Sequence, residues 1–189
     1  RVERLPEARG RVRFLSNDER TRLLEACKKN RDPLLFPLVL TALSTGCRQG
    51  ELLSLAWANV DLERGVIRLI DTKNKERRAV PLHGPARSEV VKLSKVRKID
   101  DDRVFPLTQN QLRSRWQAAL KAANILDFRF HDLRHTAASY LAMSGATLAE
   151  IAEVLGHKTL AMVKRYAHLS EQHTSEVVQR MTSKMFGGS

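Results

Sequence analysis

The sequence has few of the features that mark secreted, membrane-bound or disulfide-stabilised proteins. Its 2 cysteines, Cys27 and Cys47, are too few for a disulfide framework or a zinc motif and suit a reduced compartment. The longest apolar run, residues 34–43, is interrupted by Pro37 and is too short to span a bilayer. Residues 1–6 carry charges but no apolar segment of the signal-peptide kind. We therefore expect a cytoplasmic protein with no membrane partner.

Two patterns typical of cofactor-dependent phosphate chemistry are also missing. The sequence has no GxxxxGK[ST] loop for a nucleotide phosphate. It also has no clustered set of carboxylates of the kind that holds two magnesium ions in nucleases. We therefore predict neither a metal ion nor another cofactor, so any cations at a phosphate site must be the protein's own.

Acidic residues are scarce relative to basic ones. The chain carries 33 Lys and Arg against 21 Asp and Glu, which gives a formal net charge of +12. Such an excess points to a polyanionic partner, although RNA-binding proteins show it too. With 189 residues and 42% apolar content, the chain is long enough to bury one core.

The pattern along the chain predicts three parts. Residues 1–12 are rich in Arg, Glu, Pro and Gly, and the chain starts at Arg1 rather than Met, so we expect a linker from a removed domain. Residues 13–170 form the main domain. Residues 171–189 are expected to form a C-terminal tail helix that could be exchanged between protomers.

Hydrophobic periodicity predicts a mainly α fold with a small antiparallel β-sheet (α+β). Ser16 and Glu19 form a capping box at the first helix, and Gly145 and Gly156 stand where glycine C-caps would. Further helices are expected after Pro33 to about residue 44, from residue 48, and near residues 85–96, 108–123, 131–144, 147–155, 159–167 and 171–185. Short strands are expected at residues 57–60, 66–70 and 78–82, with a basic turn at residues 71–76.

Six scattered residues could handle a phosphate together: Arg48, Lys73, His131, Arg134, His157 and Tyr166. Arginines and histidines supply fixed cations and donors for a phosphodiester in its transition state, and a tyrosine supplies an oxygen nucleophile. In a strongly basic chain, this set is typical of an enzyme that cuts and rejoins DNA.

Local spacing supports parts of this set. His131 and Arg134 are three apart at a helix start, so both can face one phosphate. Arg48 precedes Glu51 by less than a turn, so the carboxylate can orient the guanidinium from behind.

Each residue also has an ordinary explanation when it is taken alone. Arg48 and Glu51 could be a surface pair, and Arg134 could pair with Asp132. Lys73 could lie in a solvated turn, His157 could be a cap, and Tyr166 could fill the edge of the core. Tyr140, the other tyrosine, lies among small apolar residues that favour a packing role.

The order and context of these pieces resemble the tyrosine recombinase (phage integrase) family. The resemblance extends from about residue 14 to 170 and rests on five segments: Thr45-Gly46-Cys47-Arg48-Gln49-Gly50-Glu51-Leu52, Thr72-Lys73-Asn74-Lys75 with Val80-Pro81-Leu82, His131-Asp132-Leu133-Arg134-His135-Thr136, Leu155-Gly156-His157-Lys158-Thr159, and Tyr166.

The resemblance implies the catalytic-domain fold of tyrosine recombinases and a role for each residue. Tyr166 resembles the nucleophile that forms a 3′-phosphotyrosyl link, and Arg48 and Arg134 resemble the pair that clamps the phosphate. The remaining matches are the general acid (Lys73, rather than the neighbouring Lys75), the proton-transfer histidine (His131), a further phosphate donor (His157), and two supporting carboxylates (Glu51 and Asp132).

The resemblance also implies partners. These are double-stranded DNA and further copies of the chain, which the resemblance implies form a tetrameric synapse of the full-length protein. It also implies a bacterial or phage-encoded recombinase of a mobile element. Two alternatives stay open. A type IB topoisomerase would share the chemistry but relax supercoils without a second site, and a basic DNA-binding regulator would hold phosphates without cleaving them.

Overall fold

The computed structural model describes residues 13–71, 76–97, 100–157 and 159–186. The elements follow in the order α1 (Asn17–Lys28), α2 (Leu35–Thr45), α3 (Gln49–Leu53), η1 (Trp57–Asn59), β1 (Val60–Asp61), β2 (Val66–Asp71), β3 (Glu76–Pro81), α4 (Gly84–Ser94), α5 (Gln109–Ala122), α6 (Asp132–Met143), α7 (Leu148–Leu155), η2 (Leu160–Met162), η3 (Lys164–Ser170) and α8 (Glu171–Phe186), where η denotes a 3₁₀ helix.

The predicted fold class is confirmed. Helices dominate, and the three strands form one antiparallel sheet in the order β1-β2-β3. In the β2–β3 ladder Val66 lies opposite Pro81 and Asp71 lies opposite Glu76. The turn between these strands, residues 72–75, lies outside the described residues.

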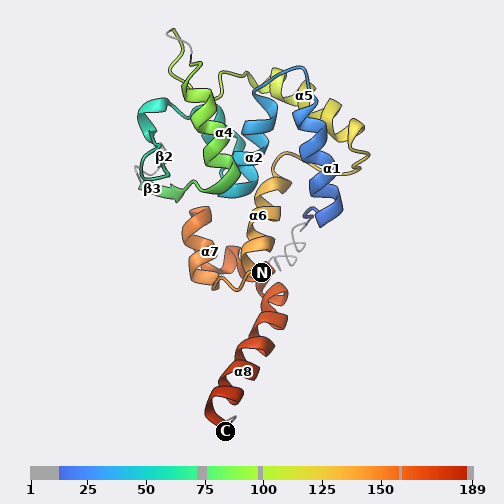
Figure 1. The fold of residues 1–189 in the computed structure, drawn as a ribbon, viewed down its shortest axis with the longest axis vertical. Coiled ribbons are helices and arrows are strands. Elements are labelled where there is room, and N and C mark those ends of the chain that lie inside the picture. Colours follow the sequence, from blue (N-terminus) through green and yellow to red (C-terminus); the bar gives the residue numbers. More distant parts are fainter. Residues whose placement is uncertain (1–12, 72–75, 98–99, 158, 187–189) are drawn as a thin grey trace, which may run out of the picture.

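Helix α2 forms the centre of the larger core. Its residues are mostly apolar, and Leu35, Leu38 and Val39 are each 0% exposed. Helices α1, α4 and α6 all pack against it (Figure 1). The predicted capping box begins α1. The Ser16 side chain accepts from the Glu19 backbone N–H, and the Glu19 side chain accepts from the Ser16 backbone N–H.

Helix α6 joins two separate cores. Leu133, in its first turn, belongs to the larger core around α2, whereas Ala138 and Ala142 belong to a smaller core with α7 and η3. In Figure 1 this helix accordingly runs from the upper body down to α7. Residues at its beginning are therefore fixed by the large core, and the segment that holds Tyr166 is fixed by the small one.

Two predicted elements were wrong in kind. Residues 57–59, expected to begin a strand, form the 3₁₀ turn η1, because Asn59 N–H donates back to Ala56 O at 3.0 Å and Trp57 N–H donates to Asp102 O at 2.9 Å.

Residues 159–167, expected to be one α-helix, form the 3₁₀ helices η2 and η3. In this stretch Val163 and Tyr166 are the buried residues. Their three-residue spacing matches one 3₁₀ turn rather than a broad α-helical face.

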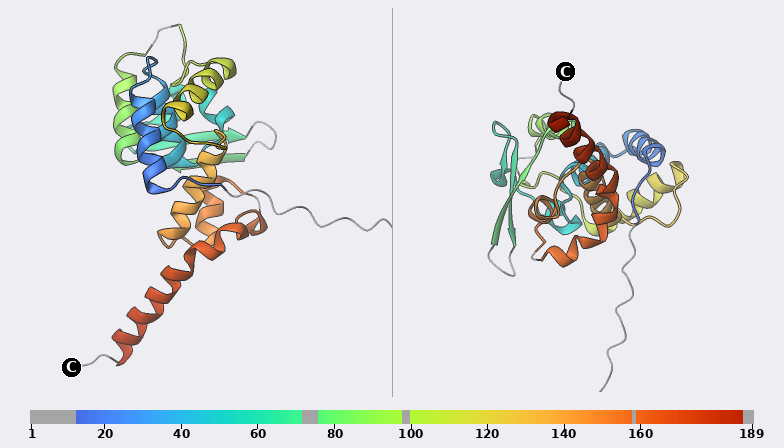
Figure 2. Two further views of the ribbon diagram at one scale, coloured as in Figure 1. Left: turned by 90° about the vertical axis from the view of Figure 1, so that its right-hand side faces the viewer. Right: turned by 90° about the horizontal axis from the view of Figure 1, so that it is seen from below.

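Helix α8 extends away from the rest of the molecule (Figures 1 and 2). It spans Glu171–Phe186, close to the predicted residues 171–185. Its exposed apolar side chains are Val177, Val178, Met181, Met185 and Phe186. Among the described residues, none of the helices is both long enough and apolar enough to cross a membrane.

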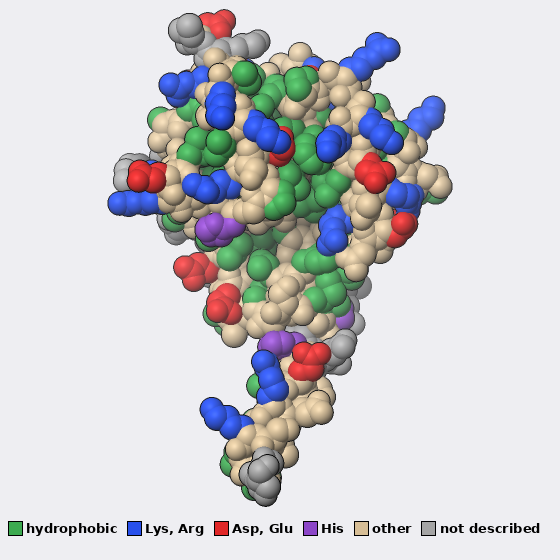
Figure 3. Space-filling model, in the orientation of Figure 1, with side chains coloured by type: hydrophobic (Ala, Val, Ile, Leu, Met, Phe, Trp, Pro, Cys, Tyr) green, Lys and Arg blue, Asp and Glu red, His purple; other side chains and the backbone are tan. Residues whose placement is uncertain are grey.

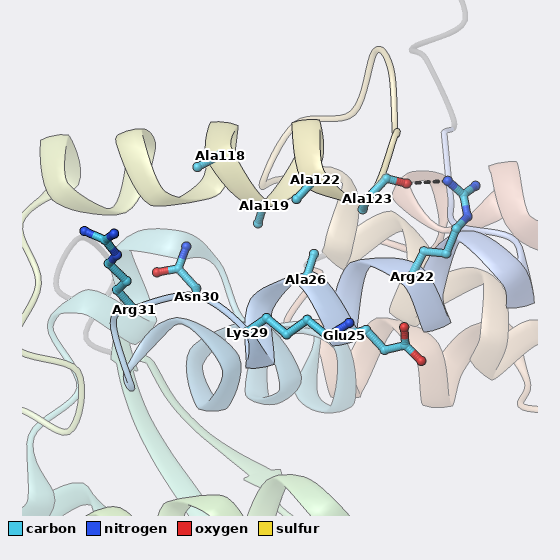
Figure 4. Close-up of a pocket in the computed structure, with 10 residues that line it drawn as sticks. All are labelled: Arg22, Glu25, Ala26, Lys29, Asn30, Arg31, Ala118, Ala119, Ala122 and Ala123. Atoms are coloured by element: carbon cyan, nitrogen blue, oxygen red, sulfur yellow. Dashed lines mark hydrogen bonds between the residues drawn. The ribbon is translucent and has the colours of Figure 1, made fainter.

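Basic side chains spread over the body and along α8 on the face shown in Figure 3, with fewer acidic ones among them. A hollow of about 410 Å³ lies between α1 and α5, where Arg22 and Lys29 flank a floor of alanines (Figure 4). Arg22 closes one end by donating to the Ala123 carbonyl. None of the six candidate residues lines this hollow, so it is separate from the candidate site.

Candidate active site

Arg48 is held by Glu51 in the way the spacing predicts. Helix α2 ends at Gly46 with φ 64°, which turns the chain so that Arg48 becomes the extended N-cap of α3. The Glu51 carboxylate accepts from the Arg48 backbone N–H at 2.6 Å and from its Nη1 at 2.9 Å. The Arg48 side chain remains 43% exposed. Its backbone end is therefore fixed while part of the guanidinium is open to a ligand.

Arg134 is buried, with 4% of its surface exposed. Its Nη1 donates to Gly46 O at 2.7 Å and its Nη2 donates to Leu155 O at 2.6 Å. Both acceptors are carbonyls at C-terminal helix ends, which carry partial negative charge. Burial, with added repulsion from Arg48, lowers the pKa of Arg134 to about 10, so the guanidinium stays charged at neutral pH.

A third arginine, Arg78 of β3, enters the same cluster. Its Nη2 donates to Glu51 Oε2 at 3.0 Å, and its Nη1 donates to the Leu155 carbonyl that Arg134 also uses. Sequence reasoning missed it because it lies in a basic strand. The available signal was parity: Arg78 alternates with Val80 and Leu82, both 0% exposed, so it shares their inward face.

His157 follows the left-handed cap Gly156 at the end of α7, as predicted. Its Nδ1 is buried and has no hydrogen-bond partner among the described residues. Burial and the nearby Arg134 and Arg48 lower the pKa of His157 to about 4, which leaves a neutral imidazole at pH 7. A ring nitrogen without a hydrogen-bond partner, close to two arginines, suits an anionic ligand. Such a ligand can accept a hydrogen bond from the imidazole or donate one to it.

His131 occupies the N-cap of α6 and is exposed. Partial desolvation, followed by Arg134, lowers its pKa. The neighbouring Asp132 is buried and accepts from the Arg129 backbone N–H at 2.8 Å, which fixes the approach to α6. Trp116 supports the same segment, with its ring 5.2 Å from that of Phe130.

Tyr166 lies in η3 and is only 1% exposed, deeper than the rim position that its alternative explanation allowed. Its hydroxyl lies 2.5 Å from Nδ1 of His135. Burial lowers the pKa of His135 to about 4, so the imidazole is neutral and can accept this hydroxyl. Burial raises the pKa of Tyr166.

The histidine that contacts the tyrosine is therefore His135, while His131 stacks edge-on against it at 5.3 Å. The sequence feature that could have identified His135 is its position one residue after Arg134, within the motif of residues 131–136.

The structure thus brings most of the six candidate residues into one region. Arg48, Arg134 and His157 are coupled electrostatically, and His131 is coupled to both arginines. Tyr166 lies on the other side of His135, within electrostatic reach of Arg134. Lys73 and the alternative Lys75 lie outside the described residues. The assembled groups form a cationic cluster beside a buried phenol.

This fold is the catalytic-domain fold of tyrosine recombinases. The catalytic domain of bacteriophage HP1 integrase superposes with a TM-score of 0.72 at 29% identity, covering 89% of this chain and 95% of that one. The XerA recombinase superposes with a TM-score of 0.68 at 25% identity, covering 92% and 65%.

The family model described as "Phage integrase family" matches residues 13–173, and the chain belongs to that family. The shufflon-specific DNA recombinase of Escherichia coli is 37% identical over 85% of this chain and 41% of its own length. The integrase of Salmonella phage P22 is 32% identical over 95% of this chain and 49% of its own length. This chain therefore spans about half the length of these relatives.

Proposed function

We propose that this chain is the strand-cleaving domain of a site-specific DNA recombinase or integrase. The observation that carries the proposal is the meeting of Arg48, Arg134 and His157 beside Tyr166, in a family member of net charge +12. A phosphodiester under attack gains negative charge on its non-bridging oxygens, and fixed cations stabilise that charge most when they need no rearrangement. The relative named a DNA recombinase supports DNA as the substrate.

In the proposed reaction, the Tyr166 oxygen attacks the scissile phosphorus and the bond from phosphorus to the 5′ oxygen breaks. The products are a 3′-phosphotyrosyl link and a 5′-hydroxyl. The phenol proton passes to a histidine, for which we propose His131, and Lys73 gives a proton to the leaving oxygen. Arg48 and Arg134 clamp the non-bridging oxygens, and His157 donates to one of them. The reverse steps with another 5′-hydroxyl rejoin the strands without ATP or a metal ion.

The hydroxyl of Tyr166 must leave His135 before it can attack. Tyr166 is 1% exposed and its hydroxyl is bound to an imidazole, whereas a duplex can reach only groups at the protein surface. We propose that the conformation described here is a resting one, and that DNA binding turns η3 so that the phenol faces Arg48 and Arg134. The 3₁₀ geometry of η3 suits such a change, because its hydrogen bonds are poorer than those of an α-helix.

The test is a covalent adduct. Because the recognition sequence is unknown, we would use a pool of randomised duplexes that each carry one nick, at positions that differ across the pool. Where the nick lies close to the cleavage point, the cut flank diffuses away and the adduct is trapped. The wild-type chain should retain DNA after denaturation, and Tyr166→Phe should retain none while its DNA affinity holds. Tyr140→Phe is the matched control, because it removes the same oxygen from a tyrosine that binds Asn17 in α1.

The alternatives predict different results. A non-catalytic DNA-binding regulator would give no adduct in any variant, and undiminished adduct with Tyr166→Phe would refute the nucleophile. A type IB topoisomerase-like enzyme would relax a supercoiled plasmid that carries no recombination site, whereas a recombinase should exchange strands between two selected sites.

We also propose that α8 packs against a second copy of the chain on DNA, within a tetrameric synapse of the full-length protein. The exposed Val178, Met181 and Phe186 give it an uncovered apolar side. Residues 1–12 would lead from a DNA-binding domain, and residues 13–170 would form the catalytic domain. Removing residues 171–189 should abolish assembly on DNA in a mobility assay, and unchanged assembly would refute this role of the tail.

A further inference from the structure

Arg78 connects strand β3 to two segments of the candidate site, α3 and the end of α7. Through Nη2 it binds Glu51 at 3.0 Å, and Glu51 holds both the backbone N–H and the guanidinium of Arg48. Through Nη1 it binds the carbonyl of Leu155, which also accepts from Arg134. One side chain of the sheet therefore links the α3 arginine to the end of α7, two residues before His157.

The side chain is closely enclosed. It is 15% exposed, and its Nε is buried with no acceptor among the described residues. It lies directly against Gly156, where an added Cβ would overlap Nη1 and come within 2.8 Å of Cδ. Gly156 also has a φ of 65°, which few residues with side chains adopt. Glycine at position 156 therefore leaves the space that the Arg78 guanidinium occupies beside the turn.

We propose that Arg78 is a positioning residue for strand cleavage, which holds Glu51 so that Arg48 is aimed at the phosphate and holds the Leu155–His157 turn in register with it. The inference rests on the proposed function. Arg78 acts through Glu51 and Leu155, and its own contacts are with protein groups.

The physical reason lies in the charge balance of Glu51. One carboxylate binds two guanidiniums and a backbone N–H. Without Arg78, the carboxylate is free to rotate toward Arg48 or solvent, and the two-point hold on Arg48 loosens. A displacement of about 1 Å at a reacting group costs about 10²-fold in rate. Lysine would keep the positive charge but cannot reach two acceptors in different directions with a planar fork.

The experiment compares Arg78→Ala and Arg78→Lys with Arg68→Ala. Arg68 lies on the neighbouring strand β2 and pairs with Asp61 at the surface, so it controls for the loss of one positive charge from the sheet. Adduct formation is followed with the nicked duplexes at saturating DNA, and DNA affinity is measured separately. We expect both Arg78 variants to form adduct about 10²-fold more slowly with affinity within a few-fold of wild type. Arg68→Ala should keep the wild-type rate.

A double-mutant cycle with Glu51→Gln separates positioning from direct phosphate contact. If Arg78 acts through Glu51, Arg78→Lys should add less than about threefold to the loss already caused by Glu51→Gln. A full loss in both backgrounds would overturn the action through Glu51 that the proposal assigns to Arg78. Wild-type rates of adduct formation in both Arg78 variants would also overturn the inference. So would variants that lose thermal stability while the folded protein forms adduct at the wild-type rate. Absence of any adduct with the unaltered chain would instead refute the proposed function, so the two failures are distinguishable.

Discussion

Acidification should destabilise this protein through two half-buried histidines, His135 and His157. Burial lowers the pKa of His135 and of His157 to about 4 each, against an ordinary value of about 6.5 in an unfolded chain. Between these values the unfolded state binds more protons than the folded state, so stability falls as pH falls. This loss of folding free energy is absent above about pH 6.5 and reaches its full size below about pH 4.

The magnitude follows from the same two values. At pH 5, a shift from about 6.5 to about 4 gives about 2 kcal/mol for each imidazole as an upper limit. Both rings keep some contact with solvent, so about 1 kcal/mol each is the better expectation. Together they should remove about 2 kcal/mol between pH 7 and pH 5, which is a large part of a typical folding free energy.

Two measurements test this expectation. Urea unfolding at pH 7 and pH 5 should show the loss, and His135→Gln should remove about half of it because an amide oxygen can still accept the Tyr166 hydroxyl without titrating. His168→Gln, at an exposed histidine, is the control and should leave the loss unchanged. Direct NMR titration of the rings is decisive: a pKa near 6.5 for both His135 and His157 in the folded protein would refute the reasoning.

Three further predictions concern packing, electrostatics and the general acid. Gly46→Ala should lower the free energy of unfolding by about 2–5 kcal/mol in urea titrations, because φ is 64° and the new Cβ would overlap Leu155. Gly50→Ala, with open space around it, should not, and equal effects would contradict the packing argument. Affinity for DNA should fall on the order of 10³-fold between about 50 and 200 mM salt, and a flat profile would exclude a phosphate-dominated interface. Lys73→Ala should cleave slowly but recover on a duplex whose bridging 5′ oxygen is sulfur, whereas rescue of Lys75→Ala instead would reassign the acid.

The sequence predicted those parts of the fold that depend on local signals. The Ser16 capping box begins α1, and the glycines at positions 46 and 156 end α2 and α7 in left-handed conformations. These devices act within one turn of the chain, so nearby residues suffice to reveal them. The short element at residues 57–59 was missed because its shape depends on the distant Asp102 carbonyl.

The same distinction between local and long-range contacts applies to the candidate site. The contact of Arg48 with Glu51 lies within one turn and was readable from spacing. The Arg78 contacts cross 27 residues to Glu51 and 77 residues to Leu155, so only the folded sheet reveals them. The contact between Tyr166 and His135 likewise crosses 31 residues. The catalytic roles of the six residues stay predictions until cleavage is measured.

Both cores contribute to the candidate site. Arg48 and Arg134 are tied to Glu51, Gly46 O and Leu155 O, at positions where the large core and α7 meet. Tyr166 belongs to the small core of α6, α7 and η3, and this core leads directly into the projecting α8. Because η3 leads directly into α8, a force on α8 reaches the segment that holds Tyr166 first. If the proposed function holds, neighbouring copies that bind α8 can control when the phenol of Tyr166 is released from His135.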